Sequence, residues 1–154
     1  MNKNCFKTKG VIVLIVIMAG LAGSCCTDKY CIGSDDMDYI QFNGFPTSEL
    51  DTIIIQRFSK NSNFATVIEN TTIVTSNFSA GSNFQHIQLP VRLVVDYDYK
   101  LQLKSTGENF TISDFVTKKE SCNTGFMCND SYNSLESYLI NGKLKSTYQL
   151  EISK

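Results

Sequence analysis

Alternation of apolar and polar side chains over residues 91–104 constrains the fold more than any other feature of the sequence. In the segment VRLVVDYDYKLQLK every odd-numbered residue is apolar or aromatic, and Val94 is the one apolar residue at an even number. Successive side chains of a β-strand point to opposite faces, so this period indicates a strand with one face on a core and one in water. The segment therefore predicts a long, half-buried strand.

Shorter segments of the same kind predict further strands, and a turn signal joins the last two. Strand-like patterns cover residues 39–42, 50–58, 84–89 and 110–116, with weaker ones in ATVIE and TTIVT. Near the C-terminus Asn141 and Gly142 separate SYLI from KLKSTYQLEI. Because Asn-Gly supplies the positive φ angles of a type I′ turn, residues 137–152 are expected to form a hairpin with Tyr148, Leu150 and Ile152 on one face.

These signals together predict an all-β fold. No segment beyond the N-terminal region shows a sustained helical period, and seven to nine short strands with turns between them are typical of a sandwich. We expect a single antiparallel β-sandwich, immunoglobulin-like or transthyretin-like in general form. A small closed β-barrel is the alternative, because its strand number and strand length also fit.

A short apolar block near the N-terminus predicts export. Lys3, Lys7 and Lys9 precede the block VIVLIVIMAGLA at residues 11–22, and no acidic residue comes before it. Twelve residues at about 1.5 Å each span roughly 18 Å, well short of the ~30 Å hydrocarbon core of a bilayer. The block is therefore interpreted as a signal peptide and not as a transmembrane helix.

The end of this block leads through Ala22, Gly23 and Ser24 into Cys25, and AGSC resembles the lipobox of bacterial lipoproteins. With its polar spacer and single β-domain, the whole chain resembles the small lipoproteins of Bacteroidota. The resemblance implies that Cys25 is lipidated and anchors the protein in the bacterial cell envelope, at the outer membrane on its periplasmic face or at the cell surface. An ordinary secretory cleavage before Cys25 is the alternative. The expected organisation is a removed signal peptide (1–24), a lipidated N-terminus with a polar tether (25–38) and a β-domain (39–154).

The mature chain is expected to be mildly acidic and of single-domain size. Removal of residues 1–24 leaves 130 of the 154 residues and takes away three lysines, so the formal net charge changes from −1 to −4. A chain of this length can bury one hydrophobic core. Because nucleic-acid binding depends on neutralising phosphates and no Lys/Arg cluster stands out, nucleic acid is not an expected partner.

The remaining cysteines fit an oxidising compartment. Three disulfide pairings are open among Cys26, Cys31, Cys122 and Cys128. The short loop between Cys122 and Cys128 favours a local bridge, which contributes about 2 kcal/mol in the loop-entropy treatment. A bridge from Cys31 to this loop would contribute about 4.7 kcal/mol. Zinc bound by all four is less favoured because of their spacing, so neither a metal nor another cofactor is expected.

One pair of carboxylates is a candidate for catalysis. On a continuous strand Asp96 and Asp98 would share a face with Cα atoms about 6.6 Å apart, a separation that glycoside hydrolysis can use. Arg92 and Lys100 would lie on the same face. These neighbours favour a solvated row of charges over an active site.

The single histidine and the tyrosines are the other candidates. His86, in FQHIQL, leaves one possible imidazole base, and the favoured interpretation is an outward strand residue beside Gln85 and Gln88. The chain has no tryptophan, the usual platform for stacking on sugars. The candidates for a binding surface are therefore Tyr97, Tyr99, Tyr132 and Tyr138.

Two short segments resemble envelope signals of Bacteroidota. The acidic tether TDKYCIGSDDMD, at residues 27–38, is similar to export tags that follow a lipidated cysteine. Asp51, Thr52 and Ile53 resemble an O-glycosylation site, with Thr52 as the modified residue. The aspartates of the tether do not have the spacing or the glycine turn of a calcium-binding EF loop.

A non-enzymatic, lipid-anchored envelope module is the favoured function. The expected partners are the membrane, through the lipid, and a protein or a glycan. One alternative is an envelope hydrolase that uses Asp96 and Asp98 or His86. Another is an inhibitor or immunity-type lipoprotein that presents the loop between Cys122 and Cys128.

Overall fold

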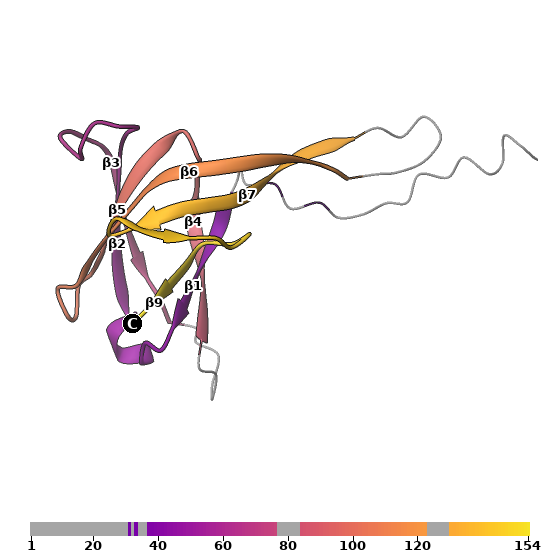
Figure 1. The fold of residues 1–154 in the computed structure, drawn as a ribbon. Helices are drawn as coiled ribbons and strands as arrows, with labels where there is room; N and C mark the ends of the chain where they lie inside the picture. Colours follow the sequence, from indigo (N-terminus) through magenta and orange to yellow (C-terminus); the bar gives the residue numbers. More distant parts are fainter. Residues whose placement is uncertain (1–30, 32, 34–36, 77–83, 123–129) are drawn as a thin grey trace, which may run out of the picture. The chain divides into compact units, whose positions relative to one another are not determined.

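The computed structural model describes residues 31, 33, 37–76, 84–122 and 130–154. Within them no helix has the length and apolar character that crossing a membrane requires. Nine strands and one short 3-10 helix form in this part of the chain (Figure 1). In chain order they are β1 (Met37–Asn43), η2 (Thr47–Glu49), β2 (Thr52–Ser59), β3 (Val67–Val74), β4 (Phe84–Leu93), β5 (Tyr97–Leu103), β6 (Asn109–Ser121), β7 (Ser131–Ile140), β8 (Lys143–Lys145) and β9 (Glu151–Ser153).

The strands form two open sheets that pack together. One sheet has the strand order β4-β1-β9, and the other has the order β3-β2-β5-β6-β7-β8. β1 pairs antiparallel with β4 and parallel with β9, as the three neighbouring strands in Figure 1 show. The expected antiparallel β-sandwich is confirmed, and the two open sheets are not the closed barrel of the alternative.

The chain divides into two compact units. The larger unit comprises residues 32–119 and 133–154, and the smaller comprises residues 1–31 and 120–132. In the smaller unit Cys31 and Cys122 form a disulfide, with Cα atoms 5.8 Å apart. Because Cys122 pairs with Cys31, the local bridge to Cys128 that the short loop favours does not form. Cys26 and Cys128 themselves lie outside the described residues.

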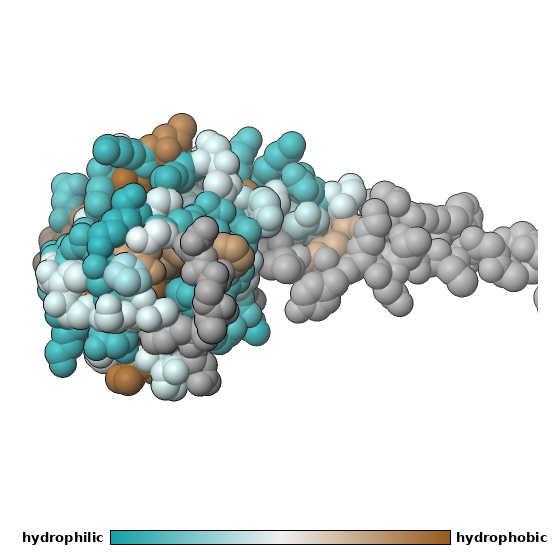
Figure 2. Space-filling model, turned by 90° about the horizontal axis from the view of Figure 1, so that it is seen from below, coloured by the Kyte–Doolittle hydropathy of each residue, from teal (hydrophilic) through white to brown (hydrophobic). Residues whose placement is uncertain are grey.

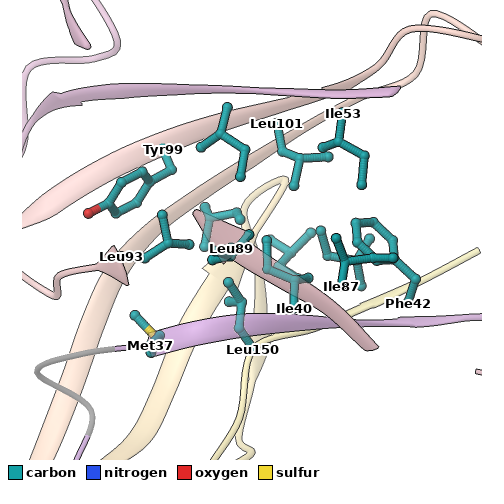
Figure 3. Close-up of a cluster of buried hydrophobic side chains, with 14 of the residues drawn as sticks. Met37, Ile40, Phe42, Ile53, Ile87, Leu89, Leu93, Tyr99, Leu101 and Leu150 are labelled. Carbon is teal, nitrogen blue, oxygen red and sulfur yellow. The ribbon is translucent and has the colours of Figure 1, made fainter. Parts of the chain in front are cut away.

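The hydrophobic core lies between the two sheets and is built from inward-facing strand residues. In β4 burial alternates over residues 84–89, with Gln85, Ile87 and Leu89 inward. Fully burying an aliphatic side chain contributes about 1.5–3 kcal/mol. The same alternation leaves Phe84 and His86 on the outer face of the three-stranded sheet. Figure 3 labels core residues from both sheets, among them Ile40, Phe42, Ile87 and Leu89 from one and Ile53, Tyr99 and Leu101 from the other.

The prediction of one strand over residues 91–104 is wrong. β4 ends at Leu93, β5 begins at Tyr97, and the two strands belong to different sheets. Alternation continues through the break because both strands turn odd-numbered residues such as Leu93 and Tyr99 into the same core. A period of two therefore reports which side chains are buried, and not where the chain passes from one sheet to the other.

The C-terminal hairpin forms but is shorter than expected. β7 and β8 pair antiparallel around Asn141 and Gly142, whose φ angles are 49° and 75°. The chain then leaves the six-stranded sheet, and β9 pairs with β1 instead. Tyr148, Leu150 and Ile152 were expected on one face, but Leu150 and Ile152 are buried whereas Tyr148 is 79% exposed.

Candidate functional site

Aromatic side chains gather on the outer face of the three-stranded sheet, away from the core. Tyr39 of β1 and Phe84 and His86 of β4 occupy outward positions, because their neighbours Ile40, Gln85 and Ile87 are buried. Tyr148, between β8 and β9, is exposed, and its hydroxyl lies near that of Tyr39. We call Tyr39, Phe84, His86 and Tyr148 the outer aromatic face.

Three of these rings, Tyr39, His86 and Phe84, contact one another in a row that we call the stack. The rings of Tyr39 and His86 are nearly parallel, at 7°, with centroids 5.3 Å apart. Phe84 lies 5.3 Å from His86 on the same strand, with its ring tilted by 50°. The strand register explains the first contact: Tyr39 is opposite Gln88, and therefore diagonal to His86, within the reach of aromatic side chains.

Tyr39 is also held by the segment that precedes β9. Its hydroxyl donates a hydrogen bond to Oε1 of Gln149 at 2.6 Å. Burial raises the pKa of Tyr39 most, and the nearby hydroxyl of Tyr148 adds the next contribution. Tyr39 therefore remains a neutral donor, and Tyr148 lies within electrostatic reach of it.

Amide side chains surround the rings. Gln88 lies opposite Tyr39, and Gln41 lies opposite His86. The Nε2 group of Gln41 donates to Oδ1 of Asn43 at 2.9 Å. The outward positions of β1 over residues 39–43 and of β4 over residues 84–90 hold no Asp, Glu, Lys or Arg. The charged neighbours of this surface are the carboxylates of Asp38, which precedes Tyr39, and of Glu151, which lies opposite Gln41. The surface thus presents aromatic rings and amide donors and acceptors beside acidic groups.

A second candidate is a hollow between the sheets, where β3 lies beside β4. Its volume is about 20 Å³, and its lining includes Arg57, Glu69, Pro90 and Tyr99. A volume of this size holds about one water molecule. Arg57 Nη2 is 2.5 Å from Glu69 Oε2, and the guanidinium lies 4.7 Å from the ring centroid of Tyr97. Since the charged groups pair with each other and the space is small, this hollow is the weaker candidate.

The predicted carboxylate pair is not brought together on one face. Asp96 lies exposed in the turn between β4 and β5, whereas Asp98 is 4% exposed. Asp98 Oδ2 accepts a hydrogen bond from the backbone N–H of Asn61 at 2.9 Å. The expectation of a solvated row of charges is therefore also wrong for Asp98, which holds the loop between β2 and β3. The active site and the solvated row of charges were both predicted for a continuous strand, and the turn that contains Asp96 interrupts this strand.

The tyrosines named from the sequence as a binding surface are mostly elsewhere. Tyr99 and Tyr138 are 1% and 0% exposed and belong to the core. His86 does lie outward on a strand, as predicted, although its neighbour Gln85 faces inward. The stack with Tyr39 was missed because it depends on pairing between strands far apart in the sequence. The pattern FQHIQL alone places Phe84, His86 and Gln88 on one face.

Of the two modification sites predicted from the sequence, Cys25 and Thr52, only Thr52 lies among the described residues. Cys25 lies outside the described residues. Thr52 is the first residue of β2 and is partly exposed, and its carbonyl oxygen accepts a hydrogen bond from the N–H of Lys104 at 3.0 Å. Among the described side chains, no group of three His, Cys, Asp or Glu residues is placed to hold a metal ion.

Comparison of the chain with protein-family models, curated protein sequences and solved structures finds no match. The functional argument therefore depends on the surface chemistry described above.

Proposed function

We propose that this protein is a lipid-anchored module of the bacterial cell envelope that binds a partner through its outer aromatic face. It acts without catalysis. Lipid on Cys25 fixes the chain to the membrane, and the β-sandwich presents the outer face of its three-stranded sheet. The stack of Tyr39, His86 and Phe84 on that face is the observation that carries the proposal.

The exposure of these rings supports a binding role. Phe84 is 47% exposed and Tyr148 is 79% exposed, although aromatic side chains are among those that gain most from burial. Aromatic groups gathered on one exposed surface are typical of interaction sites. The surface in Figure 2, seen from below the view of Figure 1, is mainly hydrophilic, and its apolar residues form separate spots.

The test is retention of a partner by the full-length mature protein in solubilised envelopes. Wild-type protein is compared with the variant F84A/Y148A and with the matched control Leu144→Ala, whose side chain is 68% exposed on β8. We expect a protein or polysaccharide to be retained in stoichiometric amount by the wild type and the control, and lost with the double variant. Equal retention by all three, or no stoichiometric partner, would contradict the proposal.

A further inference from the structure

We infer that the ligand of the outer aromatic face is a neutral glycan. The inference rests on the proposed function and adds the chemical class of the ligand. It follows from three properties of the surface: the exposure of its rings, the amides around them, and charged neighbours that are acidic, with no Lys or Arg in residues 39–43 or 84–90.

Two of the rings, Phe84 and Tyr148, offer apolar surface to solvent. Because Phe84 is tilted by 50° from His86, part of its ring is left to solvent, which agrees with its 47% exposure. Tyr148 is 79% exposed, and its hydroxyl lies near that of Tyr39. A pyranose ring carries patches of C–H groups on its faces, and such patches pack against aromatic rings through hydrophobic and weak C–H contacts.

The side chains around the rings match hydroxyl groups. Gln41 and Gln88 each carry a carbonyl acceptor and an amide donor. A sugar hydroxyl both donates and accepts, so amides can satisfy it in either orientation. The outward positions of β1 and β4 next to the rings hold no Leu, Ile or Val in Tyr39–Asn43 or in residues 84–90. A protein interface normally adds a more apolar centre, so the surroundings favour a polyhydroxylated ligand over a protein.

The charges beside the rings restrict the class of ligand further. The charged groups nearest the stack are acidic: Asp38 precedes Tyr39 on β1, and Glu151 of β9 lies opposite Gln41. Burial is the largest cause of the rise in the pKa of Tyr39, and both carboxylates add to it. Aromatic stacks that bind single-stranded nucleic acid are combined with basic grooves that follow the phosphates. An anionic glycan likewise requires basic side chains that neutralise its negative charges. A neutral glycan is the class that this surface complements.

Native affinity electrophoresis of the mature protein in detergent tests the inference. Gels contain neutral polysaccharides (mannan, xylan or mixed-linkage β-glucan) or the anionic polygalacturonate. We expect at least one neutral polysaccharide to retard the wild type and Leu144→Ala alike. We expect F84A/Y148A to weaken that affinity by about tenfold or more, and Gln88→Ala to weaken it less.

The outcomes separate this inference from the proposed function. Retardation by none of the neutral polysaccharides, by polygalacturonate alone, or equally for wild type and F84A/Y148A would overturn the glycan assignment. If F84A/Y148A instead loses a stoichiometric protein partner from envelopes and no glycan binds, the proposed function stands and the ligand class is wrong. Unchanged circular dichroism of each variant confirms that the comparison is made between folded proteins.

Discussion

The hydroxyl oxygen of Tyr138 accepts a hydrogen bond from the backbone N–H of Glu151 at 2.7 Å. Tyr138 belongs to β7 in one sheet and Glu151 begins β9 in the other, so this bond spans the point where the chain changes sheets. Tyr99 has a similar role at the crossing between β4 and β5. Its hydroxyl accepts from the N–H of Val94 at 2.8 Å and donates to the Val94 carbonyl at 3.0 Å.

Loss of the Tyr138 hydroxyl should therefore destabilise the fold. Tyr138→Phe leaves the N–H of Glu151 without its partner, and an unsatisfied buried donor costs about 1–3 kcal/mol. Urea unfolding of the mature protein measures the change. Tyr148→Phe removes an exposed hydroxyl and is expected to change stability by no more than about 0.5 kcal/mol. Equal effects of the two variants would show that the Tyr138 bond does not hold the crossing.

Stability should also decline at alkaline pH. Burial, the largest cause, raises the pKa of both Tyr99 and Tyr138 above the ordinary value of 10.0. Below that value both hydroxyls are protonated in the folded and the unfolded protein, and their contribution to stability is complete. As pH rises towards the higher pKa of the folded state, the unfolded chain loses its tyrosine protons first, and this contribution is lost. Urea midpoints between about pH 9 and about pH 11 measure the decline. The urea midpoint should fall less steeply with pH in Tyr99→Phe than in Tyr148→Phe. Identical slopes in the two variants would show that the buried hydroxyl of Tyr99 does not cause the decline.

Reduction of the disulfide should lower the free energy of unfolding. Cys31 and Cys122 are 91 residues apart, and closing a loop of this length restricts the unfolded chain by up to about 4.7 kcal/mol. Unfolding of the wild type with and without reductant gives the difference, and Cys31→Ser should unfold as the reduced wild type does. An oxidised protein whose Cys122 is joined to Cys128 in peptide maps would contradict the observed pairing.

Lipid on Cys25 is expected in the mature protein. The intact mass should show removal of residues 1–24 and the addition of a diacylglycerol and an acyl chain, enough apolar surface for stable anchoring. Cys25→Ser should leave the protein unlipidated and release it from membranes on washing. A mature protein that begins at an unmodified Cys25 would contradict the anchor and indicate an ordinary secretory cleavage.

Local sequence pattern predicted most of the strands, but it predicted neither the break between β4 and β5 nor which distant strands pair with each other. FQHIQL predicts that His86 faces outward, although the grouping of Gln85 with it is wrong, and Asn141 and Gly142 predict the last hairpin, because both signals act within a few residues. The stack of Tyr39 on His86 depends on a register between distant strands, which local pattern does not specify. The same holds for the pairing of Cys31 with Cys122. The prediction that Asp96 and Asp98 share a face is wrong for a different reason: Asp96 lies in a turn, although the apolar–polar alternation of the sequence continues across it.

The proposed recognition surface is tested most directly at His86, because this is the single histidine of the chain. Acylation of its imidazole by diethyl pyrocarbonate can therefore be assigned to one position by mass spectrometry. If a partner covers the outer aromatic face in the envelope, His86 should react several-fold more slowly in isolated envelopes than in purified protein, while exposed Lys143 on β8 reacts equally in both. Equal reaction of His86 in the two preparations would show that this face is unoccupied and contradict its role in binding.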